Sequence, residues 1–308
     1  MSKVIITAAV TGSVHTPTMS PYLPIAPDEV VEDAVKAYEA GAAVVHLHMR
    51  DPETGEPAPR VDLFLEVATR IKKRCPLVLC PTTGGGQRQT VQERAAQVPV
   101  LKPELSSFNM GPTQFPLFVM KRKYNKWKYS WEPEYLEASR DYTFLNTFKT
   151  LEELVTIMDE NGTRPECEVY EVGMISNVAY LLEQGFLKRP VYIQFILGPS
   201  PFGCMAATAE NLVFLVETAR KTIGDFNWSV AAGGKNQAFM AAVALGMGGN
   251  VRVGLEDSLM VRRGELAKSS AEQVSKMVQM ADIFGLEVAT PDDAREILRL
   301  KGSDKVNF

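Results

Sequence analysis

The sequence alternates short apolar runs with longer segments of helical periodicity, and this alternation restricts the fold more than any other feature. Eight runs rich in apolar and β-branched residues recur roughly every 35 residues, and each is followed by a turn and a helix-like segment. The expected strands are residues 4–10, 43–48, 77–83, 104–109, 166–171, 191–198, 226–232 and 250–257. Strands that alternate with helices form parallel sheets. The pattern therefore predicts an α/β fold, a single-domain (β/α)8 TIM barrel over residues 1–308, with an open doubly wound sheet as the alternative.

The segment 115–145 breaks this rhythm after the fourth expected strand. It is long and aromatic, and the stretch 121–128 within it is basic. A connection of this length in a compact domain usually has a function. We therefore expect an insertion that covers the site or packs on a partner subunit. Contact with nucleotide phosphates is an alternative for the basic stretch, which a solvated charged face explains better.

Composition and charge argue against several classes of protein. The chain of 308 residues has a net charge of -4 and is 45% hydrophobic, which does not fit a protein that binds nucleic acid or a membrane surface. No run approaches the roughly 18 apolar residues of a membrane-spanning helix, and no basic leader is followed by an apolar segment. We expect a cytoplasmic protein with small-molecule ligands. The four cysteines lack a C-x-x-C spacing, so we expect buried free thiols.

His46 and His48, at the end of the second expected strand, are the clearest sign of chemistry. Side chains alternate along a strand, so these two imidazoles lie on one face, about 6 to 7 Å apart, and can converge on one metal ion. Two of the three histidines in the chain are here. Catalytic zinc usually takes three protein ligands, so a third must come from elsewhere. Two hydrogen-bonded core histidines remain the alternative.

The last expected strand offers the third ligand. Arg252, Gly254 and Glu256 are expected on one face, and glycine within a strand often marks the close approach of another group. Buried charges need an ionic partner or a metal, so we predict that Glu256 completes the site with the histidine pair. Asp257, beside Arg252, suits a general base. A structural ion pair, with Asp257 capping a helix, is the alternative.

Other strand ends give weaker signals. Glu166 and Glu168 share a face, so one of them could bind the metal or orient a histidine. Gly84 and Gly85, in a run of three glycines, offer backbone N–H groups to an anion or carbonyl, although a flexible turn explains them equally well. The stretch 232–236 is open to the same two interpretations. The two glycine-containing stretches lie at the carboxyl ends of expected strands, where barrels place their active sites.

These motifs resemble the β-keto acid cleavage enzyme family, the family of the 3-keto-5-aminohexanoate cleavage enzyme. The resemblance extends along nearly the whole chain, and two stretches are specific: AGAAVVHLHMRD at 40–51 and GGNVRVGLED at 248–257. Shorter motifs of the family occur at 6–12, 82–85, 102–105 and 166–174.

The resemblance implies a zinc-dependent barrel, usually a homotetramer, with acetyl-CoA as co-substrate. Such an acyltransferase converts a 3-keto acid and acetyl-CoA into acetoacetate and a new CoA thioester by a Claisen-type exchange. The family's site maps onto this chain as zinc ligands His46, His48 and Glu256, general base Asp257 with its partner Arg252, and pocket hydroxyls Thr82 and Ser106.

Two departures from the family concern the substrate. Where the aminohexanoate enzyme has an acid that receives an ammonium group, this chain has Val14, followed by His15. A neutral, apolar or acidic substrate side chain is therefore expected. Relatives often carry Gly-Arg where this chain reads Gly-Gly-Lys-Asn at 233–236, so the distal pocket or the CoA contact is expected to differ.

Three other functions compete with this interpretation. A zinc hydrolase on the same barrel also begins with H-x-H, but binuclear versions need more histidines than this chain has. A metal-dependent aldolase or C–C lyase that does not use CoA remains the main alternative. A barrel that only binds ligands leaves the polar residues at the strand ends without a role.

Overall fold

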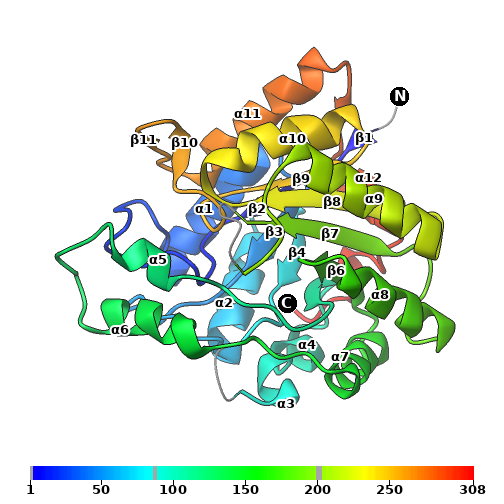
Figure 1. The fold of residues 1–308 in the computed structure, drawn as a ribbon, viewed down its shortest axis with the longest axis horizontal. Coiled ribbons are helices and arrows are strands. Elements are labelled where there is room, and N and C mark those ends of the chain that lie inside the picture. Colours follow the sequence, from blue (N-terminus) through cyan, green and yellow to red (C-terminus); the bar gives the residue numbers. More distant parts are fainter. Residues whose placement is uncertain (1–2, 86–88, 199–202) are drawn as a thin grey trace.

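Eight parallel strands form one sheet in a computed structural model that describes residues 3–85, 89–198 and 203–308 (Figure 1). The strand order is β4-β3-β2-β9-β8-β7-β6-β5. The strands are β2 (Ile6–Ala9), β3 (Val44–Leu47), β4 (Val78–Pro81), β5 (Leu105–Asn109), β6 (Arg164–Val169), β7 (Tyr192–Leu197), β8 (Asn227–Ala232) and β9 (Asn250–Val253). Each of them falls at an expected strand, so the prediction of an eight-stranded parallel α/β fold is confirmed.

The sheet curls into a nearly closed, TIM-barrel-like form whose last seam lies between β4 and β5. The backbone N–H groups of Val78 and Thr82 donate to the carbonyls of Ala43 and Leu47, on the β3 side. The backbone nitrogen of Pro81 is on the β5 side and has no N–H to donate across the seam. Side chains bridge this seam instead. The Ser106 hydroxyl donates to the Pro81 carbonyl, and the Thr83 hydroxyl donates to the Ser107 carbonyl, both at 2.6 Å.

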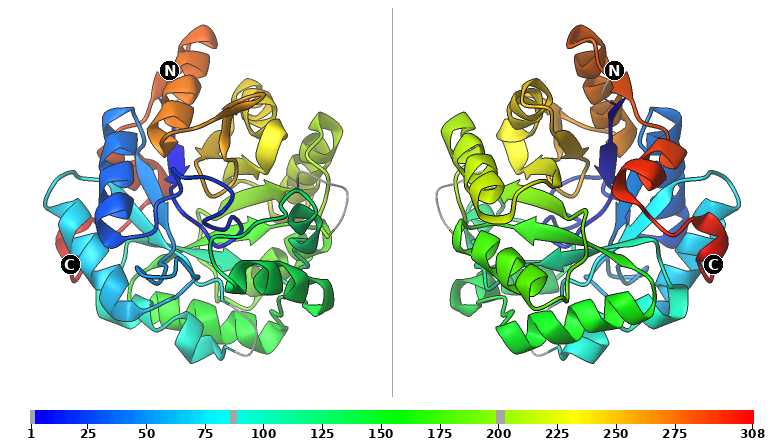
Figure 2. Two further views of the ribbon diagram at one scale, coloured as in Figure 1. Left: turned by 90° about the vertical axis from the view of Figure 1, so that its left-hand side faces the viewer. Right: turned by 90° about the vertical axis from the view of Figure 1, so that its right-hand side faces the viewer.

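Helices surround the strands (Figure 2). They are α1 (Pro27–Glu39), α2 (Val61–Lys72), α3 (Val91–Arg94), α4 (Gln97–Leu101), α7 (Phe148–Glu160), α8 (Gly173–Glu183), α9 (Ala209–Ile223), α10 (Gln237–Gly246) and α11 (Ser270–Ile283). A turn at residues 95–96 separates α3 from α4. Pro99 explains the break, because its ring clashes with the carbonyl four residues earlier, at Ala95.

The barrel has two apolar layers. The larger layer lies between strands and helices and includes Leu79, Phe108 and Phe195. The smaller one fills the barrel where the strands begin, and it contains Val44 and Leu105. There it meets α12 (Pro291–Leu298), an element that the sequence pattern did not predict. Polar groups at the opposite end of the barrel are therefore free to form a site.

Two further strand pairs were also not predicted. They are β1 (Lys3–Val4) with β12 (Glu287–Val288), and β10 (Met260–Arg262) with β11 (Glu265–Leu266). Each strand in them is only two or three residues long, too short for a periodic pattern to show. Among the described residues, no helix is both long and apolar enough to span a membrane.

The segment 115–145 follows β5 and folds over loops at the carboxyl ends of the first strands. Its helices are α5 (Phe118–Lys121), α6 (Trp131–Ala138) and the 3-10 turn η1 (Ser139–Asp141). The Tyr135 hydroxyl donates to the Ser13 carbonyl at 2.8 Å, and the Trp131 indole donates to the Thr54 carbonyl at 3.1 Å. The segment therefore lies on the loops that follow β2 and β3, beside the candidate site.

Candidate metal centre and active site

His46, in β3, and His48, one residue past the end of β3, lie on one face, as strand alternation predicts. Their ring centroids are 5.1 Å apart. The Nε2 atoms of His46 and His48 lie 3.6 and 3.5 Å from the same oxygen, Glu256 Oε1. The possible ligand atoms of these three side chains all lie within 4.8 Å of one another. The structure thus brings together the three residues that the sequence singled out as metal ligands.

Glu256 reaches the histidines from a turn, so the strand predicted over 250–257 is four residues too long. β9 ends at Val253, and Gly254 has a φ of +144° that side-chain-bearing residues rarely adopt. A Cβ on Gly254 would lie 2.1 Å from the carbonyl oxygen of Ala9. This close approach bends the chain, and the Glu256 N–H then donates to the same carbonyl at 3.0 Å.

Arg252 links the acidic groups of the site. Its guanidinium donates to both oxygens of Asp257 at 3.0 Å and to Glu256 at 2.7 Å. The remaining nitrogen donates to Gln194 at 2.9 Å and to Glu168 at 3.4 Å. The arginine side chain is only 3% exposed, so its charge is stabilised by these partners. A bidentate pair of this kind fixes the plane of the Asp257 carboxylate.

The protonation states of the cluster suit a divalent metal. Burial lowers the pKa of His46 well below its usual range, which keeps the imidazole neutral. Burial alone would raise the pKa of Glu256, but Arg252 and the two histidines hold it well below its usual range. Neutral imidazole and ionised carboxylate are the donors that zinc binds. The buried Oε2 of Glu256 also has no hydrogen-bond partner, so the donor set fits a metal ion.

Two other carboxyl groups of the site are shifted toward neutrality. Burial raises the pKa of Asp257 to about 6, although the Arg252 guanidinium opposes the change. Burial likewise raises the pKa of Glu168 to about 7. The hydroxyl of Tyr170 donates to Glu168 at 3.1 Å. A carboxyl with a pKa near 6 is ionised at neutral pH and is a stronger base than an exposed aspartate.

Thr82 lies inside the barrel, in phase with the inward-facing residues of β4. Its hydroxyl accepts the Gly84 N–H at 2.9 Å and so fixes the turn that follows the strand. Gly85 packs so closely on Arg94 that an added Cβ would lie 2.5 Å from the arginine Cγ. Gly86, the third glycine of the run, lies outside the described residues.

Ser106 is expected to place a hydroxyl in the pocket, and in the structure it does not lie on the inner face of β5. Ser106 shares the outward face of β5 with Phe108, which packs in the layer beneath the helices, and its hydroxyl donates to a carbonyl of β4. Ser107 and Asn109 alternate with it and share the inner face with Leu105. Both are buried, so they are the inward-facing polar residues of this strand, and the sequence analysis did not single out Ser107.

Val14 and His15 lie in the loop after β2 and are both half-buried. His15 Nδ1 is 3.0 Å from the carbonyl oxygen of Leu255, the residue before the candidate ligand Glu256. Burial lowers the pKa of His15 to about 4, so this side chain is neutral at physiological pH. The loop therefore presents neutral side chains next to the metal centre.

Arg50 fixes this loop, a role that the sequence analysis did not assign. The guanidinium is buried and donates to neutral groups: the Thr11 hydroxyl at 2.8 Å, the Thr11 carbonyl at 3.2 Å, the His15 carbonyl at 2.8 Å and the Gly55 carbonyl at 2.9 Å. The one feature of the sequence that pointed to Arg50 was its position directly after the strand with the two histidines. The arginine joins the loops that follow β2 and β3.

A model of the beta-keto acid cleavage enzyme family matches residues 3–300. The 3,5-dioxohexanoate:acetyl-CoA acetone transferase of Paraburkholderia graminis is 43% identical over 307 residues, which are 99% of this chain and 98% of that protein. The 3-keto-5-aminohexanoate cleavage enzyme of Fusobacterium nucleatum is 36% identical, over 98% of this chain and 99% of that protein.

Among solved structures, the binary complex of ObcA with oxaloacetate aligns with a TM-score of 0.73. The alignment covers 91% of this chain and 68% of that chain at 22% identity. At this identity the match supports the fold and nothing finer.

Proposed function

Since this chain belongs to the β-keto acid cleavage enzyme family, we propose that it is a zinc-dependent transferase that converts a 3-keto acid and acetyl-CoA into acetoacetate and a new acyl-CoA. The observation that carries the proposal is the meeting of His46, His48 and Glu256 beside the Arg252–Asp257 pair. These residues hold the metal and the base in one buried cluster, on a single (β/α)8 domain.

His46, His48 and Glu256 would hold the zinc ion, which would supply a Lewis acid for the keto oxygen of the substrate. Asp257, oriented by both nitrogens of Arg252, removes a proton from the carbon between the keto and carboxylate groups. This carbon attacks the acetyl thioester and releases the CoA thiolate. The thiolate then cleaves the original acyl bond, and Asp257 returns the proton to the acetoacetate carbon.

We propose a neutral substrate side chain, because Val14 and the neutral His15 stand where a cationic group would need an acid. Arg50, a charged residue near this loop, donates all three of its guanidinium nitrogens to backbone and hydroxyl oxygens. The relative named for 3,5-dioxohexanoate supports this choice, since the side chain of that compound is uncharged at neutral pH. The family likeness also supports a homotetramer, which light scattering can test.

An acetoacetate assay across 3-keto acids of different side-chain charge tests the proposal. We expect acetoacetate only when acetyl-CoA is present, with 3,5-dioxohexanoate preferred over the cationic 3-keto-5-aminohexanoate and the acidic 3-oxoadipate. Cleavage of the keto acid without acetyl-CoA would instead support the C–C lyase. No cleavage of any member of the panel would contradict both.

A further inference from the structure

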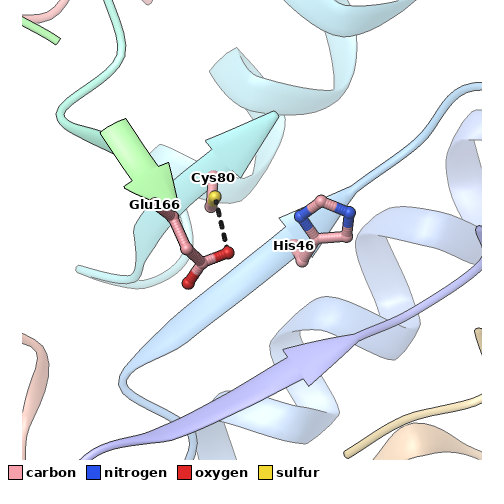
Figure 3. A group of neighbouring side chains, drawn as sticks. All are labelled: His46, Cys80 and Glu166. Atoms are coloured by element: carbon pink, nitrogen blue, oxygen red, sulfur yellow. Dashed lines mark hydrogen bonds between the residues drawn. The ribbon is translucent and has the colours of Figure 1, made fainter. Parts of the chain in front are cut away.

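The second ring nitrogen of His46 faces a buried cluster that the proposed reaction does not use. His46 turns Nε2 toward Glu256. On the other side, Cys80 from β4 and Glu166 from β6 point toward the imidazole, and possible ligand atoms of the three lie within 4.8 Å of one another (Figure 3). All three residues are no more than 1% exposed.

Two atoms of this cluster lack partners. His46 Nδ1 and Glu166 Oε2 are buried, and neither has a hydrogen-bond partner. The other carboxylate oxygen, Glu166 Oε1, accepts the Cys80 thiol at 3.6 Å. Buried polar atoms are rarely left unpaired in folded proteins, so an unpaired donor and an unpaired acceptor on neighbouring side chains indicate a bond that forms when the site is loaded.

If His46 binds the metal through Nε2, its Nδ1 needs a hydrogen-bond acceptor. The neutral imidazole then carries its proton on Nδ1, and metal-bound histidines usually donate that proton to a carboxylate or carbonyl, which fixes the ring. The carbonyl of Cys80 also lies near the ring but outside hydrogen-bond geometry. The carboxylate of Glu166 is the acceptor with an unused oxygen.

We propose that Glu166 is a positioning residue for the metal site: it accepts the Nδ1 proton of His46, while the Cys80 thiol holds its other oxygen in place. The inference rests on the proposed role of His46 as a metal ligand. It requires only a small movement of the Glu166 side chain, because the two groups already lie within 4.8 Å.

Zinc affinity of the purified full chain, measured by competition with a chromophoric chelator, tests this role. We expect Glu166→Gln and Glu166→Ala to weaken zinc binding by roughly 10- to 100-fold, with Glu166→Asp recovering part of the loss. Glu104→Gln is the matched control. Glu104 is also a buried glutamate. It pairs with Arg295 and lies near the start of β5, so its variant should keep wild-type zinc affinity.

Nitrogen NMR of the histidine rings separates positioning from general destabilisation. In the zinc-loaded protein we expect the His46 Nδ1 proton to be hydrogen-bonded, and this signal to change in Glu166→Gln but not in Glu104→Gln. Cys80→Ser keeps a donor and should bind zinc nearly as tightly as wild type, whereas Cys80→Ala should bind less tightly. Unchanged zinc affinity and an unchanged His46 signal in both Glu166 variants would overturn the inference.

Cobalt substitution tests whether the Cys80 thiol binds the metal directly. A thiolate-to-cobalt charge-transfer band that disappears in Cys80→Ala would mean that the cluster itself binds the ion, and it would overturn the positioning role. A wild-type chain that binds no zinc would overturn both this inference and the proposed metal site. Zinc binding that depends on His48 but not on Glu166 would overturn this inference alone.

Discussion

A methyl group added at Gly12 should weaken metal binding without touching a ligand atom. Gly12 has a φ of +60° and lies directly against the Glu256 side chain. A Cβ built on Gly12 would lie 2.2, 2.7 and 2.8 Å from Cγ, Cδ and Cβ of Glu256. Rotation about the glutamate's own bonds cannot relieve this overlap, because Cβ itself is involved. The whole residue must move.

The size of the displacement sets the expected effect. Ordinary van der Waals contact begins at 3.4 Å, so the 2.2 Å separation must grow by at least 1.2 Å. Metal–ligand distances tolerate only about 0.2 Å. Glu256 therefore cannot keep its place, and we expect Gly12→Ala to weaken zinc binding by at least roughly 10-fold, or about 1.4 kcal/mol. The left-handed backbone of alanine adds about 1 to 2 kcal/mol to the cost of folding.

Gly285→Ala is the matched control. Gly285 has a nearly equal φ of +68°, and its added Cβ would meet nothing within 4 Å. Both variants should lose similar backbone stability in thermal unfolding of the metal-free protein, while only Gly12→Ala should lose zinc affinity in a chelator competition. Wild-type zinc affinity in Gly12→Ala would refute the reasoning that places Glu256 on the metal.

Four further predictions follow from the site and the core. Asp257→Asn should lower acetoacetate formation by roughly 10²- to 10⁴-fold with zinc content unchanged; full activity would discard the base. Chelation should abolish turnover and added zinc should restore it, so activity in metal-free protein would argue against the metal. Val14→Glu should shift preference toward 3-keto-5-aminohexanoate, as measured by kcat/KM for the two substrates; an unchanged ratio would exclude Val14 from the pocket. Asp33→Asn should stabilise the fold at pH 7 by up to about 3 kcal/mol, because burial raises the pKa of Asp33 from 3.8 to about 6, although hydrogen bonds from Ser270 oppose the change. The stability that protonated Asp33 contributes is complete below about pH 4 and is lost as the pH rises through about 6. The free energies of unfolding of wild type and Asp33→Asn should therefore converge at low pH. A difference between them that stays constant with pH would contradict this.

The order of strands and helices could be predicted because it depends on local chemistry. Short β-branched runs bounded by glycine and proline form strands whatever lies beside them, and the eight strands fall where the sequence placed them. The shared face of His46 and His48 follows from the pleat of one strand alone. The family resemblance, carried by the stretches 40–51 and 248–257, is confirmed by the family model.

On the other strands, only the tertiary structure shows which side chains point into the barrel. Strands of a parallel barrel are buried on both sides, so apolar and polar residues do not alternate and the sequence does not show which side is inner. Ser106 and Ser107 are neighbours of the same residue type, and only the packing of Leu105 and Phe108 places Ser107 inside.

The sequence by itself determined which segments form strands and that two histidines share a face, because these depend on residues close together in the chain. Only the tertiary structure decided how Glu256 reaches them, since the turn at Gly254 results from the carbonyl of Ala9 on a neighbouring strand. The approach of Glu166 to His46 is likewise decided by barrel curvature, which brings together side chains from strands that are distant in sequence.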